Sequence, residues 1–568
     1  MGYIIGIDLG TSTTEAAVFQ NGKPVLIPDH SGDVIVPSVV GLDDEGRIIV
    51  GKQADERYLL YPDRTVKEVK RLMGSGQKVS MGQEQYTPAD ISAELLSSVK
   101  HYAENFLGGE VDRAVITVPA YFTNQQRNET IEAGKLAGLS VERIINEPTA
   151  AALCYGIDHM EEESHILVYD FGGGTFDVTL LELFEGVLEV KASSGDNCLG
   201  GKDFDEKLVQ YFLDLSRKNY GIDLKDDIYA MVKLKDAAVK CKIALSSRES
   251  YEVLIPMLSQ KNGVPVSLHT TVSVSDFNER IRGLVEKTRE AVELVLKDGH
   301  VSKDKIDLVL LTGGSTRIPY IKQYVAELFG KEPAESIDPD LSVALGAGIQ
   351  AGILDGIISH ETGIMITDVA PYALGVKTVI EDDDVFNGDY MDILIPRNIT
   401  IPVTRKKRYY TYSMFQTKCE IEVYQGEKKK ATDNAFLGKF MLSGIPPKMP
   451  GEEAVDIEFA YDVNGILKVH ARVVSTGEAA SIVIETAGAG ETVDLETWKE
   501  ASNARSYRST IRKTEKLLAR ELDGEDRMFL EECLRELKLG LIHGEDPERL
   551  GTLELELIDL AEEIKWLQ

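Results

Sequence analysis

The chain has 568 residues, of which 43% are hydrophobic, and its formal net charge at pH 7 is −32. This length predicts several packed domains, and the acidic excess argues against nucleic acid and anionic membranes as partners. No apolar run is long enough to span a membrane, no secretory signal pattern appears, and the five cysteines are scattered without a CxxC pair. We therefore expect a cytoplasmic protein that binds neither nucleic acid nor membranes.

The first part of the chain, residues 1–360, alternates β-rich and helical stretches, which predicts an α/β domain of two lobes. It contains two copies of a hairpin in which an apolar strand ends at an aspartate and is followed by glycine and hydroxyl residues. The first copy has Asp8, Gly10, Thr11, Ser12 and Thr13, and the second has Asp170, Gly172, Gly173, Gly174, Thr175 and Asp177. Consecutive glycines can adopt positive φ and present N–H groups to a phosphate, and the aspartate can hold a hydrated hard cation. Two copies indicate two lobes that face one nucleotide, whereas the second hairpin alone could equally be an ordinary turn.

Other segments of this part carry further candidates. Lys70 lies in a loop-to-helix region, and Glu147 comes just before a small-residue helix. The remaining candidates are Gly200 and Gly201 in a glycine-punctuated turn, Lys242 and Ser246 on a helix expected over 236–247, Gly313, Gly314 and Arg317 in a third glycine turn, and Asp340 before a helix expected over 341–354. Read alone, Lys70 would be a solvated helix lysine and Asp340 a helix-capping carboxylate.

The second part of the chain differs in its pattern. An apolar stretch over 364–369 stands where a linker between domains would ordinarily be polar. Residues from about 368 to 486 alternate apolar and polar, and Asn464-Gly465 is a strong hairpin signal, so we expect a compact β-sandwich. From about 494 to 568 apolar residues recur at helical spacing, which predicts a short helical segment.

This set of motifs, in this order, resembles the DnaK or 70-kilodalton heat-shock chaperone family over nearly the whole chain. The resemblance implies a multidomain protein with an actin-like, two-lobed α/β ATPase domain (1–360), an interdomain linker (361–369), a β-sandwich substrate-binding domain (370–490) and a short α-helical lid (491–568). The brief lid and the Met365-Ile366-Thr367-Asp368 linker point to a short-lid, HscC-like bacterial branch.

The resemblance also implies a reaction, the in-line attack of water on the γ-phosphate of ATP. Asp8 and Asp170 would hold Mg²⁺ through water, and Lys70 would neutralise phosphate charge. Glu147, Thr175 and Asp177 would orient the attacking water. The nucleotide, ATP or ADP, would contact Gly10, Thr11, Ser12, Thr13, Gly172, Gly173, Gly174, Gly200, Gly201, Lys242, Ser246, Gly313, Gly314, Arg317 and Asp340, and K⁺ is a further candidate ion.

By the same resemblance, unfolded or extended polypeptides would bind a cleft lined by Val376, Val379, Tyr409, Tyr412, Cys419 and Ile421. Pro119 and Arg127 would relay the nucleotide state, and Ile364, Met365 and Ile366 would form the docking part of the linker. Arg143 resembles part of the surface for a J-domain co-chaperone. Read alone, the cleft residues are core, Pro119 is a strand terminator and Arg143 is a surface arginine. The need for an exchange factor stays open, because the chain is short between Arg71 and Tyr121.

Three departures from the family pattern qualify these expectations. Val239 stands where the family usually has a glutamate for the ribose hydroxyls, so we expect weaker nucleotide binding than in the family. Thr367 replaces an apolar linker residue, and Tyr412 replaces a small residue of the cleft. A holdase or exchange-factor-like protein with little turnover is therefore the main alternative. A sugar kinase of the same nucleotide fold would not explain the linker and the β-sandwich.

Overall fold

The computed structural model describes residues 2–159, 162–184, 186–261, 264–334, 338–358, 365–382, 385–483 and 504–518, with single positions between 530 and 558. The chain forms two compact units, Met1–Ala487 and Gly488–Gln568, and each is described by itself. Within the described residues, no helix is long and apolar enough to cross a membrane.

The first lobe is built on a sheet with strand order β11-β10-β1-β2-β3, in which β4 also pairs with β2. Its strands are β1 (Tyr3–Leu9), β2 (Thr13–Gln20), β3 (Lys23–Leu26), β4 (Val36–Pro37), β10 (Val111–Val118) and β11 (Ser140–Asn146). Around it lie β5 (Val39–Leu42), β6 (Ile48–Val50), β7 (Thr65–Lys67), β8 (Val79–Met81), β9 (Glu84–Tyr86), α1 (Lys52–Arg57), η1 (Pro62–Arg64), η2 (Val69–Leu72), α2 (Pro88–Leu107), α3 (Asn124–Leu136) and α4 (Glu147–Gly156). The antiparallel β1–β2 hairpin carries Asp8, as predicted.

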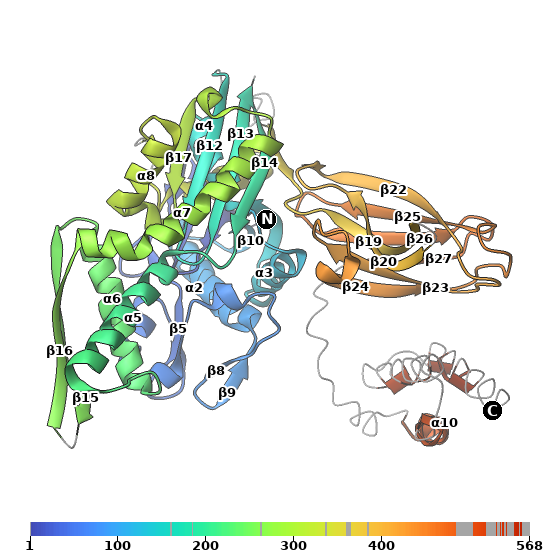
Figure 1. Cartoon of the computed structure of the whole chain (residues 1–568), viewed down its shortest axis with the longest axis horizontal. Coiled ribbons are helices and arrows are strands. Elements are labelled where there is room, and N and C mark those ends of the chain that lie inside the picture. Colours follow the sequence, from blue (N-terminus) through green and yellow to red (C-terminus); the bar gives the residue numbers. More distant parts are fainter. Residues whose placement is uncertain are drawn as a thin grey trace. The chain divides into compact units, whose positions relative to one another are not determined.

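The second lobe repeats this plan with strand order β17-β12-β13-β14-β18-β21. Figure 1 labels β12, β13, β14 and β17 of this sheet. Its strands are β12 (Ser164–Phe171), β13 (Phe176–Phe184), β14 (Val187–Asp196), β17 (Leu308–Thr312), β18 (Met365–Val369) and β21 (Thr400–Ile401). The remaining elements are α5 (Gly201–Tyr220), α6 (Ile228–Leu245), α7 (Val274–Asp298), α8 (Pro319–Phe329), α9 (Ser342–Leu354), η3 (Lys303–Lys305), η4 (Gly314–Arg317) and the hairpin β15 (Ser250–Lys261) and β16 (Val264–Ser273). The two-lobed α/β prediction is confirmed.

Helix α9 explains the run of small residues near the end of this domain. It packs against β1, β2 and α4, so it contacts elements of the first lobe closely. A Cβ atom at Gly346 would lie 1.8 Å from the carbonyl oxygen of Ala150, and one at Gly6 would lie 2.2 Å from the backbone of Ala347. Only glycine permits this approach of backbone to backbone, so α9 packs directly on α4 and β1.

The linker becomes a strand of the second lobe. Strand β18 pairs in parallel with β14, with Leu188 opposite Ile366, and its far end pairs with β21. Its apolar character is therefore explained by docking, as predicted. Ile364 and the stretch 359–364 lie outside the described residues.

Residues after β18 form the predicted β-sandwich of two four-stranded antiparallel sheets, ordered β20-β19-β23-β24 and β22-β25-β26-β27. Their strands are β19 (Leu374–Asp382), β20 (Val385–Ile395), β22 (Val403–Tyr410), β23 (Cys419–Gln425), β24 (Ala435–Leu442), β25 (Ala454–Tyr461), β26 (Leu467–Val473) and β27 (Ala479–Val483), with a short helix η6 (Ala431–Asp433). Alternate residues of both sheets, such as Val423 and Phe459, share one apolar core. In the C-terminal unit, α10 (Ala504–Leu518) is described, and Ile511 and Leu517 belong to a buried apolar cluster there. Its function as a lid stays a prediction.

Candidate active site

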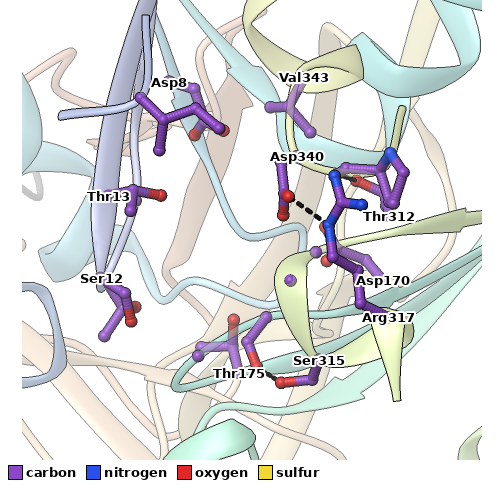
Figure 2. Close-up of a pocket in the computed structure, with 18 of the residues that line it drawn as sticks. Asp8, Ser12, Thr13, Asp170, Thr175, Thr312, Ser315, Arg317, Asp340 and Val343 are labelled. Carbon is purple, nitrogen blue, oxygen red and sulfur yellow. Dashed lines mark hydrogen bonds and ion pairs between the residues drawn. The ribbon is translucent and has the colours of Figure 1, made fainter. Parts of the chain in front are cut away.

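A cavity of about 450 Å³ lies between the two hairpins and the third glycine turn (Figure 2). Both lobes line it, and most of the predicted nucleotide residues are among the lining residues. These are Asp8, Gly10, Thr11, Ser12, Thr13, Lys70, Glu147, Asp170, Gly172, Gly173, Thr175, Lys242, Ser246, Gly313, Gly314, Arg317 and Asp340. Asp177, Gly174, Gly200 and Gly201 are not among them.

The glycines of the second hairpin allow close approach between the lobes. A Cβ atom at Gly173 would lie 2.4 Å from the Ser12 hydroxyl, and one at Gly200 would lie 2.5 Å from the backbone nitrogen of Gly174. Gly201 donates its N–H to the Gly172 carbonyl at 3.0 Å, so Gly200 and Gly201 support the hairpin from behind. The expectation of positive φ in this hairpin was wrong: none of its three glycines adopts it, whereas Gly313 does, with φ of 82°.

Lys70 is buried at the polar end of the cavity. It lies in η2, and its Nζ is 2.5 Å from Oε1 of Glu147, the first residue of α4. Their side chains are 7% and 11% exposed, so water screens this ion pair weakly. The surface-lysine interpretation of Lys70 is therefore wrong, and the lysine is buried in the lining of the cavity.

The carboxylates near this pair have shifted pKa values. Burial, followed by the charge of Glu147, raises the pKa of Asp8 to about 7 and that of Asp177 to about 8. The pKa of Asp170 is raised well above its usual value for the same two reasons. Lys70 lowers all three pKa values without cancelling the burial effect. The polar end of the cavity therefore favours an added positive charge.

A hydrated magnesium ion fits this donor set, because Asp8 and Asp170 offer oxygen ligands from opposite hairpins. Thr117 donates its hydroxyl proton to Oδ1 of Asp8 at 2.8 Å and fixes that carboxylate. Among the described residues, no group of three or more His, Cys, Asp or Glu side chains is arranged to hold a metal ion.

Asp177 lies behind the cavity wall and is opposite Asp170 in the β12–β13 register. Its Oδ1 accepts the backbone N–H of Tyr121 at 3.0 Å. Its Oδ2 is buried and has no hydrogen-bond partner within the part of the chain that the structure describes. Such an orphaned oxygen fits a group that receives a hydrogen bond from a water molecule.

Apolar side chains also line the cavity and suit contact with a nucleotide base. Ile35, Val239, Ile243, Ile318, Pro339 and Val343 line it. Lys242 is held by Asp205 at 2.7 Å and by the Gly201 carbonyl at 3.0 Å. Arg317 lies beside Asp340, with Nε 2.5 Å from the carboxylate, as Figure 2 shows. Val239, on α6, contributes an apolar side chain to the lining of the cavity.

Sequence reasoning missed several residues of this site. Ser315 donates its hydroxyl to the Gly172 carbonyl at 2.8 Å and joins the third glycine turn to the second hairpin. Glu15 lines the cavity, is 1% exposed and lies opposite Asp8 on the next strand. Its Oε1 has no partner among the described residues, and burial raises its pKa well above the usual value. The antiparallel hairpin register was the signal that could have identified Glu15.

Two of the predicted coupling residues, Arg127 and Arg143, lie near Asp368 of the linker strand. Arg127 donates to Asn146 at 2.7 Å, and Asn146 donates to Asp368 of β18 at 2.9 Å. Arg143 donates to Gln350 at 3.2 Å, and burial lowers its pKa, so it is not an ordinary surface arginine. Pro119 ends the buried strand β10 and accepts the N–H of Phe122 at 3.1 Å.

Further contacts fix the β-sandwich against the two-lobed domain within the first unit. Asn464 accepts the backbone N–H of Ile144 at 3.0 Å. Arg397 and Asn398 both bind Asp298, in each case at 2.9 Å. Thr367, the departure in the linker, has a buried hydroxyl without a partner among the described residues.

A second cavity, of about 100 Å³, lies in the β-sandwich. All six predicted cleft residues line it: Val376, Val379, Tyr409, Tyr412, Cys419 and Ile421. The hydroxyl of Tyr409 donates to Asp392 at 2.8 Å, so the floor of this cavity is partly polar. Tyr412 is exposed at its rim.

The fold and the two cavities define a nucleotide-binding protein with an attached β-sandwich. Comparison with known proteins agrees: the family model described as Hsp70 protein matches residues 4–80 and 75–527. The proteins named "Chaperone protein DnaK" from Thermotoga petrophila, Thermotoga maritima and Thermotoga neapolitana are each 44% identical to this chain over 485 residues, which covers 85% of this chain and 80% of the relative. The chain therefore belongs to the Hsp70 family.

Proposed function

We propose that the chain is an ATP-driven chaperone that binds and releases extended apolar segments of unfolded proteins. Family membership supports this function, because Hsp70 proteins are chaperones and ATPases that bind ATP or ADP with Mg²⁺. The holdase or exchange-factor alternative is not favoured. A protein without ATP turnover would not need the residues assigned to hydrolysis, and these line one cavity: Asp8, Lys70, Glu147, Asp170 and Thr175.

In the proposed reaction the protein acts by positioning and electrostatics. Bound magnesium would supply positive charge at the phosphates, and Asp8 and Asp170 are the groups to hold it through water. Lys70 neutralises phosphate charge, and Glu147 fixes its ammonium group at 2.5 Å. The free oxygen of Asp177, with Glu147 and Thr175, orients the attacking water. Thr11, Ser12, Thr13 and the backbone of both hairpins surround the phosphate oxygens.

One observation carries the coupling between ATP and peptide. The sheet that contains β12, which ends near Asp170, also contains the linker strand β18, which pairs with β21. Strand β21 lies in the chain between β20 and β22, one strand from each sheet of the sandwich. A shift of the second lobe would therefore move β18 and, through β21, the sandwich. This supports a two-state protein in which nucleotide and peptide change each other's affinity reciprocally.

The finer assignments are also proposals. Clients would bind the cavity lined by Val376 and Ile421, and a J-domain co-chaperone would bind near Arg143. The four described cysteines form no disulfide, which supports a reducing compartment such as the cytoplasm. K⁺ as a further ion, the need for an exchange factor, the short-lid branch and the domain limits all stay predictions.

Peptide release tests this function directly. A fluorescent extended apolar peptide is bound to the full chain, and its dissociation is followed after addition of Mg²⁺ with ATP or with ADP. We expect ATP to speed dissociation by at least about tenfold. A tenfold change corresponds to about 1.4 kcal/mol, which lies within the usual range of coupling free energies between two sites. Equal dissociation with ATP and ADP would contradict the proposal, and Val376→Trp in the cleft is the control for specific peptide binding.

A further inference from the structure

Tyr372 lies just after the linker strand and before β19, and it contacts the first lobe. Its hydroxyl donates a hydrogen bond of 2.8 Å to the carbonyl oxygen of Tyr121. The rings of Tyr372 and Tyr121 pack with their centroids 4.3 Å apart and an interplanar angle of 45°. This tyrosine pair is a direct contact between the β-sandwich part and the turn that follows β10.

Both the backbone N–H and the backbone carbonyl of Tyr121 form hydrogen bonds with side chains. Its N–H donates to Oδ1 of Asp177 at 3.0 Å. Its carbonyl accepts both the Tyr372 hydroxyl and the side-chain amide of Asn197, each at 2.8 Å. The two groups lie in adjoining peptide planes that meet at the Tyr121 α-carbon, so a displacement of the whole residue by Tyr372 would move both the carbonyl and the N–H. The position of Tyr372 is thereby linked to the carboxylate of Asp177.

Asp177 is sensitive to that link, because the Tyr121 N–H is the bond that orients it. The carboxylate is 1% exposed, and its Oδ2 has no partner among the described residues. Rotation of the carboxylate would redirect this free oxygen relative to Glu147 and the attacking water. Burial also raises the pKa of Tyr372, so its hydroxyl keeps its proton and stays a donor at neutral pH.

We propose that Tyr372 is a positioning residue for ATP hydrolysis, which acts through Tyr121 on Asp177 and reports to the active site whether the β-sandwich is docked. This inference rests on the proposed chaperone function. It adds a second route of coupling beside the one through Asn146 and Asp368, and this route ends on Asp177, the buried carboxylate that the proposed reaction assigns to the attacking water.

The test uses the full chain with Tyr372→Phe, which keeps the ring and loses the hydroxyl, and Tyr372→Leu, which loses both. Tyr229→Phe is the matched control, because Tyr229 is an exposed tyrosine of α6 outside both cavities. Single-turnover hydrolysis of bound ATP is measured with and without a saturating apolar peptide, together with the affinities for ATP and peptide. Hydrogen exchange over residues 119–123 is measured in parallel.

We expect Tyr372→Phe to bring the ratio of the hydrolysis rates with and without peptide about three- to tenfold closer to one. This change corresponds to the free energy of one hydrogen bond. Tyr372→Leu should have a larger effect and speed exchange at Tyr121, while both affinities and the control stay as in the unchanged chain. A purely structural role would instead lower the affinities too. An unchanged ratio and unchanged exchange in Tyr372→Leu would overturn the proposal.

Failure of the proposed function gives a different result. If peptide does not alter the rate of ATP hydrolysis in the chain without substitutions, the proposed coupling between peptide and ATP is wrong. The single-turnover rate without peptide then tests the role of Tyr372. A change of about threefold or more in Tyr372→Phe at unchanged ATP affinity supports positioning of Asp177. An unchanged basal rate overturns it.

Discussion

The side-chain amide of Asn146 donates a 2.9 Å hydrogen bond to Asp368, and Asn146 is the residue directly before Glu147. The linker is therefore held one residue away from the carboxylate that binds Lys70. Thr149 also donates to Asp368, at 2.8 Å, so one buried carboxylate of the linker is bound by two side chains at the start of α4.

Asp368→Ala should uncouple the two cavities. The change leaves the Asn146 amide and the Thr149 hydroxyl buried without this acceptor, which costs the docked linker about 1–3 kcal/mol. We expect ATP to lose most of its effect on peptide dissociation, while the affinity for ATP is retained. Asp433→Ala, at an exposed carboxylate of the β-sandwich, is the control. Full ATP-driven peptide release in Asp368→Ala would show that Asp368 does not couple the domains.

Glu15→Gln should stabilise the protein at alkaline pH. Burial and the charge of Asp8 raise the pKa of Glu15 above its ordinary value of 4.5, so the folded chain binds more protons than the unfolded chain as pH rises above 4.5. Stability is therefore lost with rising pH in this range. The negative charges of Asp8 and Asp340 raise the pKa of Glu15, and the positive charge of Lys70 lowers it.

We expect Glu15→Gln to raise the thermal unfolding midpoint at pH 8 and to leave it unchanged at pH 4. Removal of a buried charge that lacks a hydrogen-bond partner should raise the free energy of unfolding by about 1–3 kcal/mol at pH 8. Calorimetry of the nucleotide-free chain at both pH values measures this. A midpoint that rises equally at pH 4 would mean that the gain comes from packing and not from the charge.

Val239→Glu should tighten nucleotide binding. A carboxylate at this position could accept the ribose hydroxyls, and a charged hydrogen bond of about 1.5–3 kcal/mol corresponds to roughly ten- to a hundredfold in the dissociation constant. The gain should disappear with 2′-deoxy-ATP if both hydroxyls are bound. Tyr229→Glu adds the same charge to α6 outside the cavity and should have no effect. An unchanged dissociation constant for ATP in Val239→Glu would contradict the claim that Val239 weakens nucleotide binding.

The main parts of this structure could be predicted from local patterns. Two repeated hairpins, an apolar linker and an alternating β segment are properties of short stretches. Asp8 and Asp170 line the first cavity and the six predicted cleft residues line the second, while their functions stay predictions. Lys70 could be assigned only through that pattern, because its burial depends on Glu147, which is 77 residues away.

Other features depend on contacts that no short stretch encodes. Glu15 looked like part of a return strand, and its burial beside Asp8 follows from the register of two strands. Tyr372 and Tyr121 are 251 residues apart, and neither belongs to a recognisable motif. The glycines of the second hairpin were assigned to positive φ, whereas their small size serves the approach of Ser12 and the Gly200 turn.

The central claim is that ATP hydrolysis at Lys70 and Glu147 is coupled to peptide binding in the β-sandwich. The most direct measurement is steady-state ATP hydrolysis with and without an excess of an extended apolar peptide, with Lys70→Ala as the blank. We predict hydrolysis that rises with peptide and falls by at least about a hundredfold in Lys70→Ala, because the proposed reaction relies on the charge of Lys70 to neutralise the phosphates. Peptide binding with no turnover above that blank would contradict the claim.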